Sequence, residues 1–146
     1  MGLKIDYRST SLEDLTKSGE LYDIVLAMEI LEHVADRSTF IRLATKCVQP
    51  GGIIFVSTIN RTIKALATAK IGAEYILNWV PKGTHDWRKF SRPSFLVENL
   101  MHNGLEIVDI RGMHYSLFSD LWHLSNDVRV NYILHAKKLL LPLNSS

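Results

Sequence analysis

Runs of apolar residues bounded by polar or turn-forming residues predict five strands along this chain. We expect strands at residues 22–28, 53–58, 105–110 and 130–136, and a short one at residues 3–7. Residues 22–28 and 53–58 are too uniformly apolar for strands with a solvent face, so we expect both to be covered on two sides. At residues 3–7 apolar and polar positions alternate, as in a strand with one buried face.

Apolar residues at helical spacing predict helices between these strands. Ser11 can cap a first helix, and either Asp36 or Ser38 can cap a second. Pro93 suits the first turn of a later helix. A longer helical segment is expected at residues 63–80.

The order of the predicted elements favours an α/β fold. Pro50, Gly51 and Gly52 are expected to end the second helix and to turn the chain into the strand at residues 53–58. A strand, a helix and a second apolar strand in succession predict a parallel crossover unit. Residues 112–127 are expected to form a turn-rich connection.

Composition fits one globular domain and excludes several classes of protein. The chain has 146 residues, of which 47% are hydrophobic, enough for a sizeable core and too many for wholesale disorder. The formal net charge of +2 gives no sign of a nucleic-acid groove. No apolar run approaches the about 18 residues that cross a bilayer, and no signal peptide is apparent. The single cysteine, Cys47, is expected to be buried and reduced, which excludes a disulfide framework.

Three side chains able to bind a cation follow the predicted strand at residues 22–28. Glu29, Glu32 and His33 occupy positions i, i+3 and i+4, which one helical turn places on a single face. Ligands of open α/β sheets bind at the carboxyl ends of the strands, so the three residues are candidates for a Mg²⁺ or Mn²⁺ site. The alternative is that the acids favour a helix N-terminus while His33 packs or caps.

A further imidazole, His85, follows a Pro-Gly turn. It is a candidate metal ligand or general base acting on a phenol, and equally an ordinary loop histidine bonded to Asp86. The segment at residues 63–80 has Trp79 near its end and basic residues after it. Such a segment can rest on anionic lipid, roof an apolar substrate pocket or pack against its own domain.

Several motifs resemble those of the UbiG-type O-methyltransferases of ubiquinone biosynthesis. The resemblance runs from about residue 3 to residue 138, nearly the whole chain. Its most specific pieces are Gly-Ala-Glu-Tyr-Ile-Leu at residues 72–77 and Pro-Lys-Gly-Thr-His at residues 81–85. Further matching pieces lie at residues 28–34, 50–52, 57–62, 80 and 130–132.

This resemblance implies a class I methyltransferase fold and a set of roles. The sheet would be a partial Rossmann-like one, mostly parallel with an antiparallel last strand, and a helical insertion would occupy about residues 63–90. S-adenosylmethionine would be the methyl donor, and a hydroxyl of a polyprenylated catechol or benzoquinol ring the acceptor. Met28 would line the donor pocket. Glu29, Glu32 and His33 would hold Mg²⁺ or Mn²⁺, and His85 would take or relay the acceptor proton.

The chain departs from that family at its beginning. Family members carry, ahead of the matching residues, a strand with a glycine-rich loop for the donor and a second strand whose acidic end binds ribose hydroxyls. This chain has neither, so we expect residues 1–138 to be the C-terminal part of a methyltransferase domain and residues 139–146 to be a tail. The strand at residues 22–28 should then expose an unpaired apolar edge, and the chain alone should bind the donor weakly or not at all.

The resemblance also implies partners and a location. The substrate would be a polyprenylated phenol or quinol, with a membrane surface and a ubiquinone-biosynthesis complex as further candidate partners and no nucleic acid. The place would be the bacterial cytoplasm or the matrix side of the mitochondrial inner membrane, as a peripheral protein. Two other functions stay open: a noncatalytic membrane-docking or complex-forming remnant, and an RNA 2'-O-methyltransferase, which the small net charge disfavours.

Overall fold

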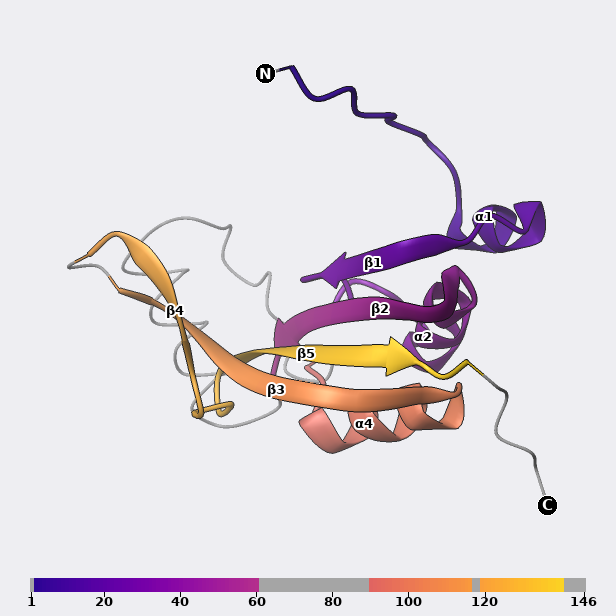
Figure 1. Cartoon of the computed structure of the whole chain (residues 1–146). Helices are drawn as coiled ribbons and strands as arrows, with labels where there is room; N and C mark the ends of the chain where they lie inside the picture. The colour runs from indigo at the N-terminus through magenta and orange to yellow at the C-terminus, as the bar shows by residue number, and fades with distance from the viewer. Residues whose placement is uncertain (1, 61–89, 117–118, 141–146) are drawn as a thin grey trace.

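A computed structural model describes residues 2–60, 90–116 and 119–140 of the chain. In this part, five strands form one sheet in the order β1-β2-β5-β3-β4, with three helices alongside (Figure 1). In chain order the elements are α1 (Leu12–Ser18), β1 (Tyr22–Met28), α2 (Arg37–Lys46), β2 (Val48–Ile59), α4 (Pro93–His102), β3 (Leu105–Ser116), β4 (Leu121–Ser125) and β5 (Asn131–Lys138).

The sheet is mixed, with its last strand in the chain antiparallel to both neighbours. β1 pairs with β2 in parallel, and the connection between them is α2. β5 runs antiparallel between β2 and β3, and β4 is the antiparallel partner of β3. The predicted α/β class, the parallel crossover and the antiparallel last strand are confirmed.

Local sequence signals account for where the helices begin. Ser11 accepts a hydrogen bond from the backbone N–H of Asp14 at 3.1 Å and caps α1. Asp36, rather than Ser38, caps α2 by accepting from the N–H of Thr39 at 3.1 Å. Each cap satisfies a backbone donor that the first helical turn leaves free. Pro93 occupies the first turn of α4, where its missing N–H costs nothing.

The hydrophobic core lies between one face of the sheet and the helices. We call this side the helix face; Figure 1 shows α2 and α4 on it. The core is built from inward-facing strand residues and the apolar stripes of α2 and α4, and it includes Ala27, Ile41, Ala44, Val48, Ile54, Val56, Leu96, Leu100, Leu105, Tyr132, Leu134 and Ala136. In the described part of the chain, no helix is long and apolar enough to cross a membrane.

The other side of the sheet, which we call the open face, is uncovered at β1. Because side chains alternate along a strand, Ile24, Leu26 and Met28 share this face, and they are 56%, 65% and 44% exposed. They pair in register with Ile53, Phe55 and Ser57 of β2. The prediction that β1 is covered on two sides is therefore wrong for this structure. Among the described residues, β1 is also the end strand of the sheet, in agreement with the predicted apolar edge.

Three other boundaries differ from the predictions. Residues 3–7 form no strand. Residues 112–127 are not a mere connection, because β3 continues to Ser116 and β4 follows it as a hairpin. α2 ends at Lys46, and β2 has already begun when the chain reaches Gly51, whose φ of 79° lies in the region that favours glycine. The predicted helix at residues 63–80, and most of the predicted insertion and tail, lie outside the described residues.

Candidate functional site

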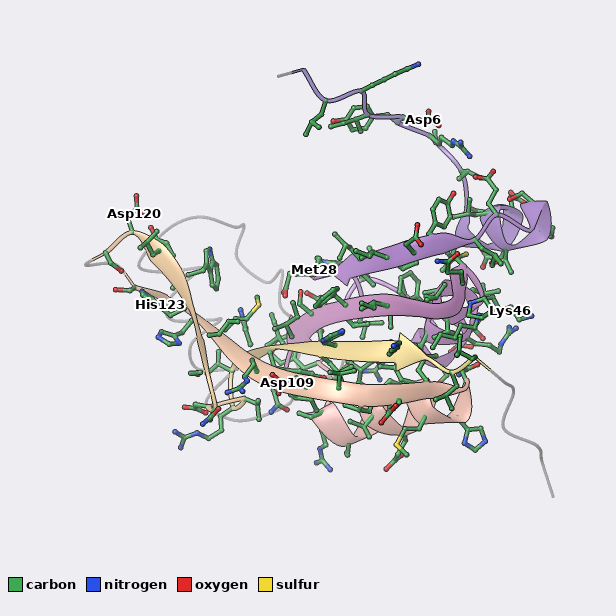
Figure 2. The ribbon with its side chains drawn as sticks, viewed as in Figure 1. Asp6, Met28, Lys46, Asp109, Asp120 and His123 are labelled. Atoms are coloured by element: carbon green, nitrogen blue, oxygen red, sulfur yellow. The ribbon has the colours of Figure 1, made fainter. Side chains whose placement is uncertain are left out.

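Polar side chains gather where the parallel strands β1 and β2 end side by side. Met28, the last residue of β1, pairs in register with Ser57 of β2; Figure 2 labels Met28 at the tip of that strand. The loop that follows β1 therefore starts beside Ser57 and Thr58. Both hydroxyl residues are fully buried, so their side chains need hydrogen-bond partners within the protein.

Glu29 is fastened to β2 through both its backbone and its carboxyl group. Its N–H donates to the backbone oxygen of Ser57 and lies within bonding distance of Ser57 Oγ, both at 3.1 Å. Ser57 Oγ in turn donates to Glu29 Oε1 at 2.6 Å. Glu29 has a φ of 49°, a left-handed conformation that few residues other than glycine adopt and that is concentrated at functional sites.

Glu32 supplies a second carboxyl group at a neighbouring position. The residue is 8% exposed, and its Oε2 accepts a hydrogen bond from Thr58 Oγ1 at 2.9 Å. Each carboxyl group is thus held by a hydroxyl of β2, Glu29 by Ser57 and Glu32 by Thr58. The carboxyl group of Glu32 acts on that of Glu29 both as a charge and as a hydrogen-bond partner.

Burial raises the pKa of Glu29 from 4.5 to about 7. Desolvation of the carboxyl group is the main cause; the Ser57 hydroxyl lowers the pKa, and the neighbouring Glu32 raises it again. The residue as a whole is exposed, but its carboxyl end lies against the buried Ser57, and that end is what titrates. The pair is therefore suited to take up one proton near neutral pH, or one cation in its place.

Asn60 and Ser91 are both hydrogen-bonded near the carboxyl end of β2. The N–H of Asn60 donates to the backbone oxygen of Val130 at 2.6 Å, and its side-chain amide donates to that of Val128 at 2.8 Å. The N–H of Ser91 donates to the oxygen of Ile59 at 3.1 Å. Asn60 and Ser91 are thus both held at the carboxyl end of β2. Asn60 is occupied in holding β2 to the loop before β5.

Tyr132 of β5 pairs in register with Thr58 of β2 and is fully buried. Its hydroxyl donates to the backbone oxygen of Ser91 at 3.1 Å. Burial raises the pKa of this phenol above its usual value, and the nearby Glu32 raises it further. Tyr132 is therefore a neutral hydrogen-bond donor that ties β5 to the chain after residue 90.

The structure brings together two of the three predicted metal ligands. Glu29 and Glu32 meet, whereas His33 is exposed and its N–H closes a turn onto the backbone oxygen of Ile30 at 3.0 Å. Residues 31–33 form this turn instead of a helix, so the helical spacing used for the prediction does not apply. Within residues 2–60, 90–116 and 119–140, no three or more His, Cys, Asp or Glu side chains are grouped to hold a metal ion.

The structure leaves the predicted roles of Met28 and His85 untested, and it adds two residues that were not predicted. Met28 lies at the end of β1 beside Ser57, and its contact with a methyl donor stays a prediction. His85 lies outside the described residues. Ser57 and Thr58 were not singled out as site residues from the sequence. The signal for them was the predicted parallel crossover, which places the last residues of both strands at the same edge of the sheet.

Comparison with known proteins identifies the family. A methyltransferase domain model matches residues 3–110, most of the chain. The chain belongs to the methyltransferase domain family. The ubiquinone biosynthesis O-methyltransferase of Bartonella bacilliformis is 49% identical over 138 residues, which cover 94% of this chain and 56% of that protein. The protein of the same name from Marinobacter nauticus is 47% identical, with 93% and 58% covered.

These relatives confirm the predicted resemblance to the ubiquinone-biosynthesis enzymes. The chain spans a little over half of their length. It is half identical to a third relative of the same name, from Rhizobium johnstonii, with 94% of this chain and 55% of that protein covered.

Solved structures confirm the methyltransferase fold of this family member. A possible histamine N-methyltransferase from Thermotoga maritima superimposes with a TM-score of 0.55 at 14% identity, covering 82% of this chain and 57% of that one. The magnesium protoporphyrin IX methyltransferase of Synechocystis gives a TM-score of 0.52 at 19% identity, covering 86% and 48%. At such identities the likeness shows the fold of S-adenosylmethionine-dependent methyltransferases.

Proposed function

We propose that this chain forms part of an S-adenosylmethionine-dependent O-methyltransferase that acts on a hydroxyl of a polyprenylated catechol or benzoquinol ring in ubiquinone biosynthesis. The observation that carries the proposal is the 47–50% identity to ubiquinone biosynthesis O-methyltransferases over 93–94% of the chain. The carboxyl pair supports it, since it lies at the carboxyl ends of β1 and β2, where ligands of α/β sheets bind.

Met28 is our candidate for contact with the methyl donor. It is 44% exposed at the end of β1, so its thioether is available to line an apolar wall of a pocket. When bound, S-adenosylmethionine supplies a methyl group on a sulfonium, which is transferred as the carbon–sulfur bond breaks and a carbon–oxygen bond forms. The protein then has two tasks: to align the acceptor oxygen with that methyl group and to receive the hydroxyl proton.

Glu29 and Glu32 are our candidates for holding a divalent cation. Two neighbouring carboxyl groups, one with a raised pKa, are a donor set that Mg²⁺ or Mn²⁺ accepts. These two residues fit such an ion, and His33 would have to turn towards them to complete the predicted set. When bound, the ion would lower the pKa of the acceptor phenol and orient its oxygen.

Two groups of the chain are candidates for receiving the hydroxyl proton. His85 is the residue that the sequence assigns to this role. The Glu29 carboxyl, with its pKa of about 7, is poised to act at neutral pH if no cation occupies the pair.

We further propose a peripheral membrane location, because a lipid-soluble acceptor is most accessible at a membrane surface. The membrane would be that of the bacterial cytoplasm or the matrix side of the mitochondrial inner membrane. A ubiquinone-biosynthesis complex is the proposed partner there.

A chimaera tests the proposal directly. The chain would replace the matching 138 residues of the Bartonella bacilliformis relative, and methyl transfer from labelled S-adenosylmethionine to a polyprenylated catechol would be measured. We expect turnover, and we expect Glu32→Gln to lower kcat by at least about tenfold because a buried ligand and hydrogen-bond acceptor is lost. Glu98→Gln, an exposed acid on α4, is the control and should change nothing.

Each other outcome rejects a stated part of the proposal. A chimaera that folds and binds the donor but transfers no methyl group supports the noncatalytic alternative. Transfer to a small RNA instead of the catechol supports the RNA alternative. Unchanged turnover in Glu32→Gln rejects the role of the carboxyl pair. Calorimetry of the chain alone with S-adenosylmethionine should show little or no heat, and strong binding would contradict the expectation of weak donor affinity.

A further inference from the structure

The segment that carries the carboxyl pair runs from the end of β1 to the start of α2, and we call residues 29–36 the carboxyl loop. At its beginning, the N–H of Glu29 donates to the backbone oxygen of Ser57 at 3.1 Å. In its middle, Leu31 is fully buried in the core. Its far end adjoins Arg37, the first residue of α2. The position of the two carboxyl groups therefore depends partly on what holds Arg37.

Arg37 binds residues that lie far away in the chain. Its Nη1 donates to the backbone oxygen of Phe90 at 3.0 Å and to Oγ of Ser91 at 3.3 Å. Its guanidinium carbon lies 5.2 Å from the ring centre of Phe95, in the first turn of α4. A planar guanidinium can donate and stack in this way, whereas an ammonium group offers no flat face. Arg37 therefore joins the end of the carboxyl loop to residues 90–95.

Ser91 is itself firmly held, so it can serve as an anchor for Arg37. It is 1% exposed. Its N–H donates to the backbone oxygen of Ile59, the last residue of β2, at 3.1 Å, and its own backbone oxygen accepts from the Tyr132 hydroxyl of β5 at 3.1 Å. With the bond from Arg37 to its Oγ, α2, β2 and β5 all meet at this one residue. Binding to Ser91 therefore fixes Arg37 to the sheet.

This anchor lies next to the carboxyl pair. Tyr132 pairs in register with Thr58, and Thr58 Oγ1 donates to Glu32 at 2.9 Å. Burial is the main cause of the raised pKa of the Tyr132 phenol; after it, Glu32 raises that pKa and Arg37 lowers it. The carboxylate and the guanidinium thus act on the same buried phenol, so both lie close to it.

We propose that Arg37 is a positioning residue for methyl transfer: by binding residues 90–91, it sets where the carboxyl loop presents Glu29 and Glu32. This inference rests on the proposed function of the carboxyl pair. Without the guanidinium, the loop would keep its start at β2 and its buried Leu31, so the fold would remain while the carboxyl groups lose their fixed place. A small misplacement of groups that align a reaction slows it strongly.

Amide hydrogen exchange of the 146-residue chain, followed by NMR, tests these contacts without any ligand. In Arg37→Gln, the amides of Glu29 and Ser91 should exchange at least about tenfold faster, because their bonds to β2 are held less firmly, while amides in the middle of β2 keep their rates. Arg42→Gln, at an exposed arginine of the same helix, is the matched control and should change neither amide. Unchanged exchange at both amides, or equal acceleration throughout the sheet, would overturn the proposal.

Kinetics of the chimaera separate positioning from a purely structural role. Arg37→Gln should lower kcat at least about fivefold and leave the KM for S-adenosylmethionine within about twofold. Arg37→Lys keeps the charge but loses the planar group, so it should recover no more than about half of the lost kcat. Unchanged kcat in Arg37→Gln, or full recovery in Arg37→Lys, contradicts the proposal. A chimaera that transfers no methyl group rejects the proposed function, and the exchange rates then still decide whether Arg37 holds the carboxyl loop.

Discussion

Both faces of the sheet carry apolar strand residues, but these residues are buried on the helix face and exposed on the open face at β1. On the helix face, Ile54, Val56 and Leu134 are at most 1% exposed. On the open face, Ile24 and Leu26 of β1 are more than half exposed, although they belong to an equally apolar run. The difference shows that an apolar pattern alone does not determine whether a strand is buried, because burial requires other elements to pack on it. α2 and α4 supply it on one side, and in the described chain nothing supplies it at β1.

The largest expected effect is on the helix face. Leu134→Ala in β5 should lower the free energy of unfolding by about 2–5 kcal/mol, because a fully buried side chain leaves a cavity. Urea denaturation followed by circular dichroism measures the change. A loss below about 1 kcal/mol would show that the helix face is not the packed core.

The next effect concerns the hydroxyls that fasten the carboxyl pair. Thr58→Val should cost about 1–3 kcal/mol, since it leaves the buried Glu32 carboxyl without its hydrogen bond. Thr58→Ser keeps the hydroxyl and should recover most of the loss. Both values come from the same urea titrations, and a larger loss in Thr58→Ser than in Thr58→Val would show that Thr58 acts through its methyl group.

The pH dependence of stability tests the raised pKa of Glu29 at the carboxyl pair. Because the folded-state pKa of Glu29 is raised to about 7, the folded chain holds this proton more tightly than the unfolded chain. The stability contributed by protonation is therefore full below pH 4.5 and is lost as the pH rises to about 7. Solvent screening of this partly exposed residue limits the loss to the order of 1 kcal/mol.

Glu29→Gln is the variant that isolates this titration. It should flatten the dependence between pH 4.5 and about 7, measured by urea denaturation in the presence of a metal chelator. Glu98→Gln, on the surface of α4, should leave the wild-type slope in place. If stability instead rises across that window in the wild type and not in Glu29→Gln, the sign of the pKa shift is wrong.

The smallest effect is expected on the open face. Ile24→Thr, at a site 56% exposed, should change the free energy of unfolding by no more than about 0.5 kcal/mol. The measurement belongs at a protein concentration where the chain is monomeric, so that packing against another copy does not enter. A loss of 2 kcal/mol or more, on the order of a buried side chain, would show that β1 is covered in solution after all.

Local signals in the sequence located most of the described elements. Ser11, Asp36 and Pro93 begin helices because each satisfies or spares a backbone donor of the first turn, a requirement that neighbouring residues settle among themselves. The hairpin of β3 and β4 was missed because residues 112–127 contain turn-forming residues. Their aromatic pairs, such as Tyr115 with Trp122, were a strand signal that the turn residues outweighed.

The candidate site was predictable in part. Glu29 and Glu32 were identified, since polar residues after an apolar strand lie at the ligand-binding edge of a parallel sheet. Their arrangement was not, because Glu29 takes a left-handed φ of 49° and the residues after it form a turn in place of a helix. Ser57 and Thr58 entered the site through a register that only the pairing of β1 with β2 fixes.

The sequence by itself determined most of the strands, the helix starts and the family, because these follow from side-chain patterning, capping and motifs within short stretches. Tertiary structure alone decided which apolar surfaces are covered in the described part of the chain, which carboxyl groups meet and which strand ends the described sheet. These depend on contacts between residues far apart in the chain, and whether an apolar strand is buried depends on what packs against it. Residues 3–7 illustrate the same dependence on distant contacts, because they have the pattern of a strand but form none in the structure.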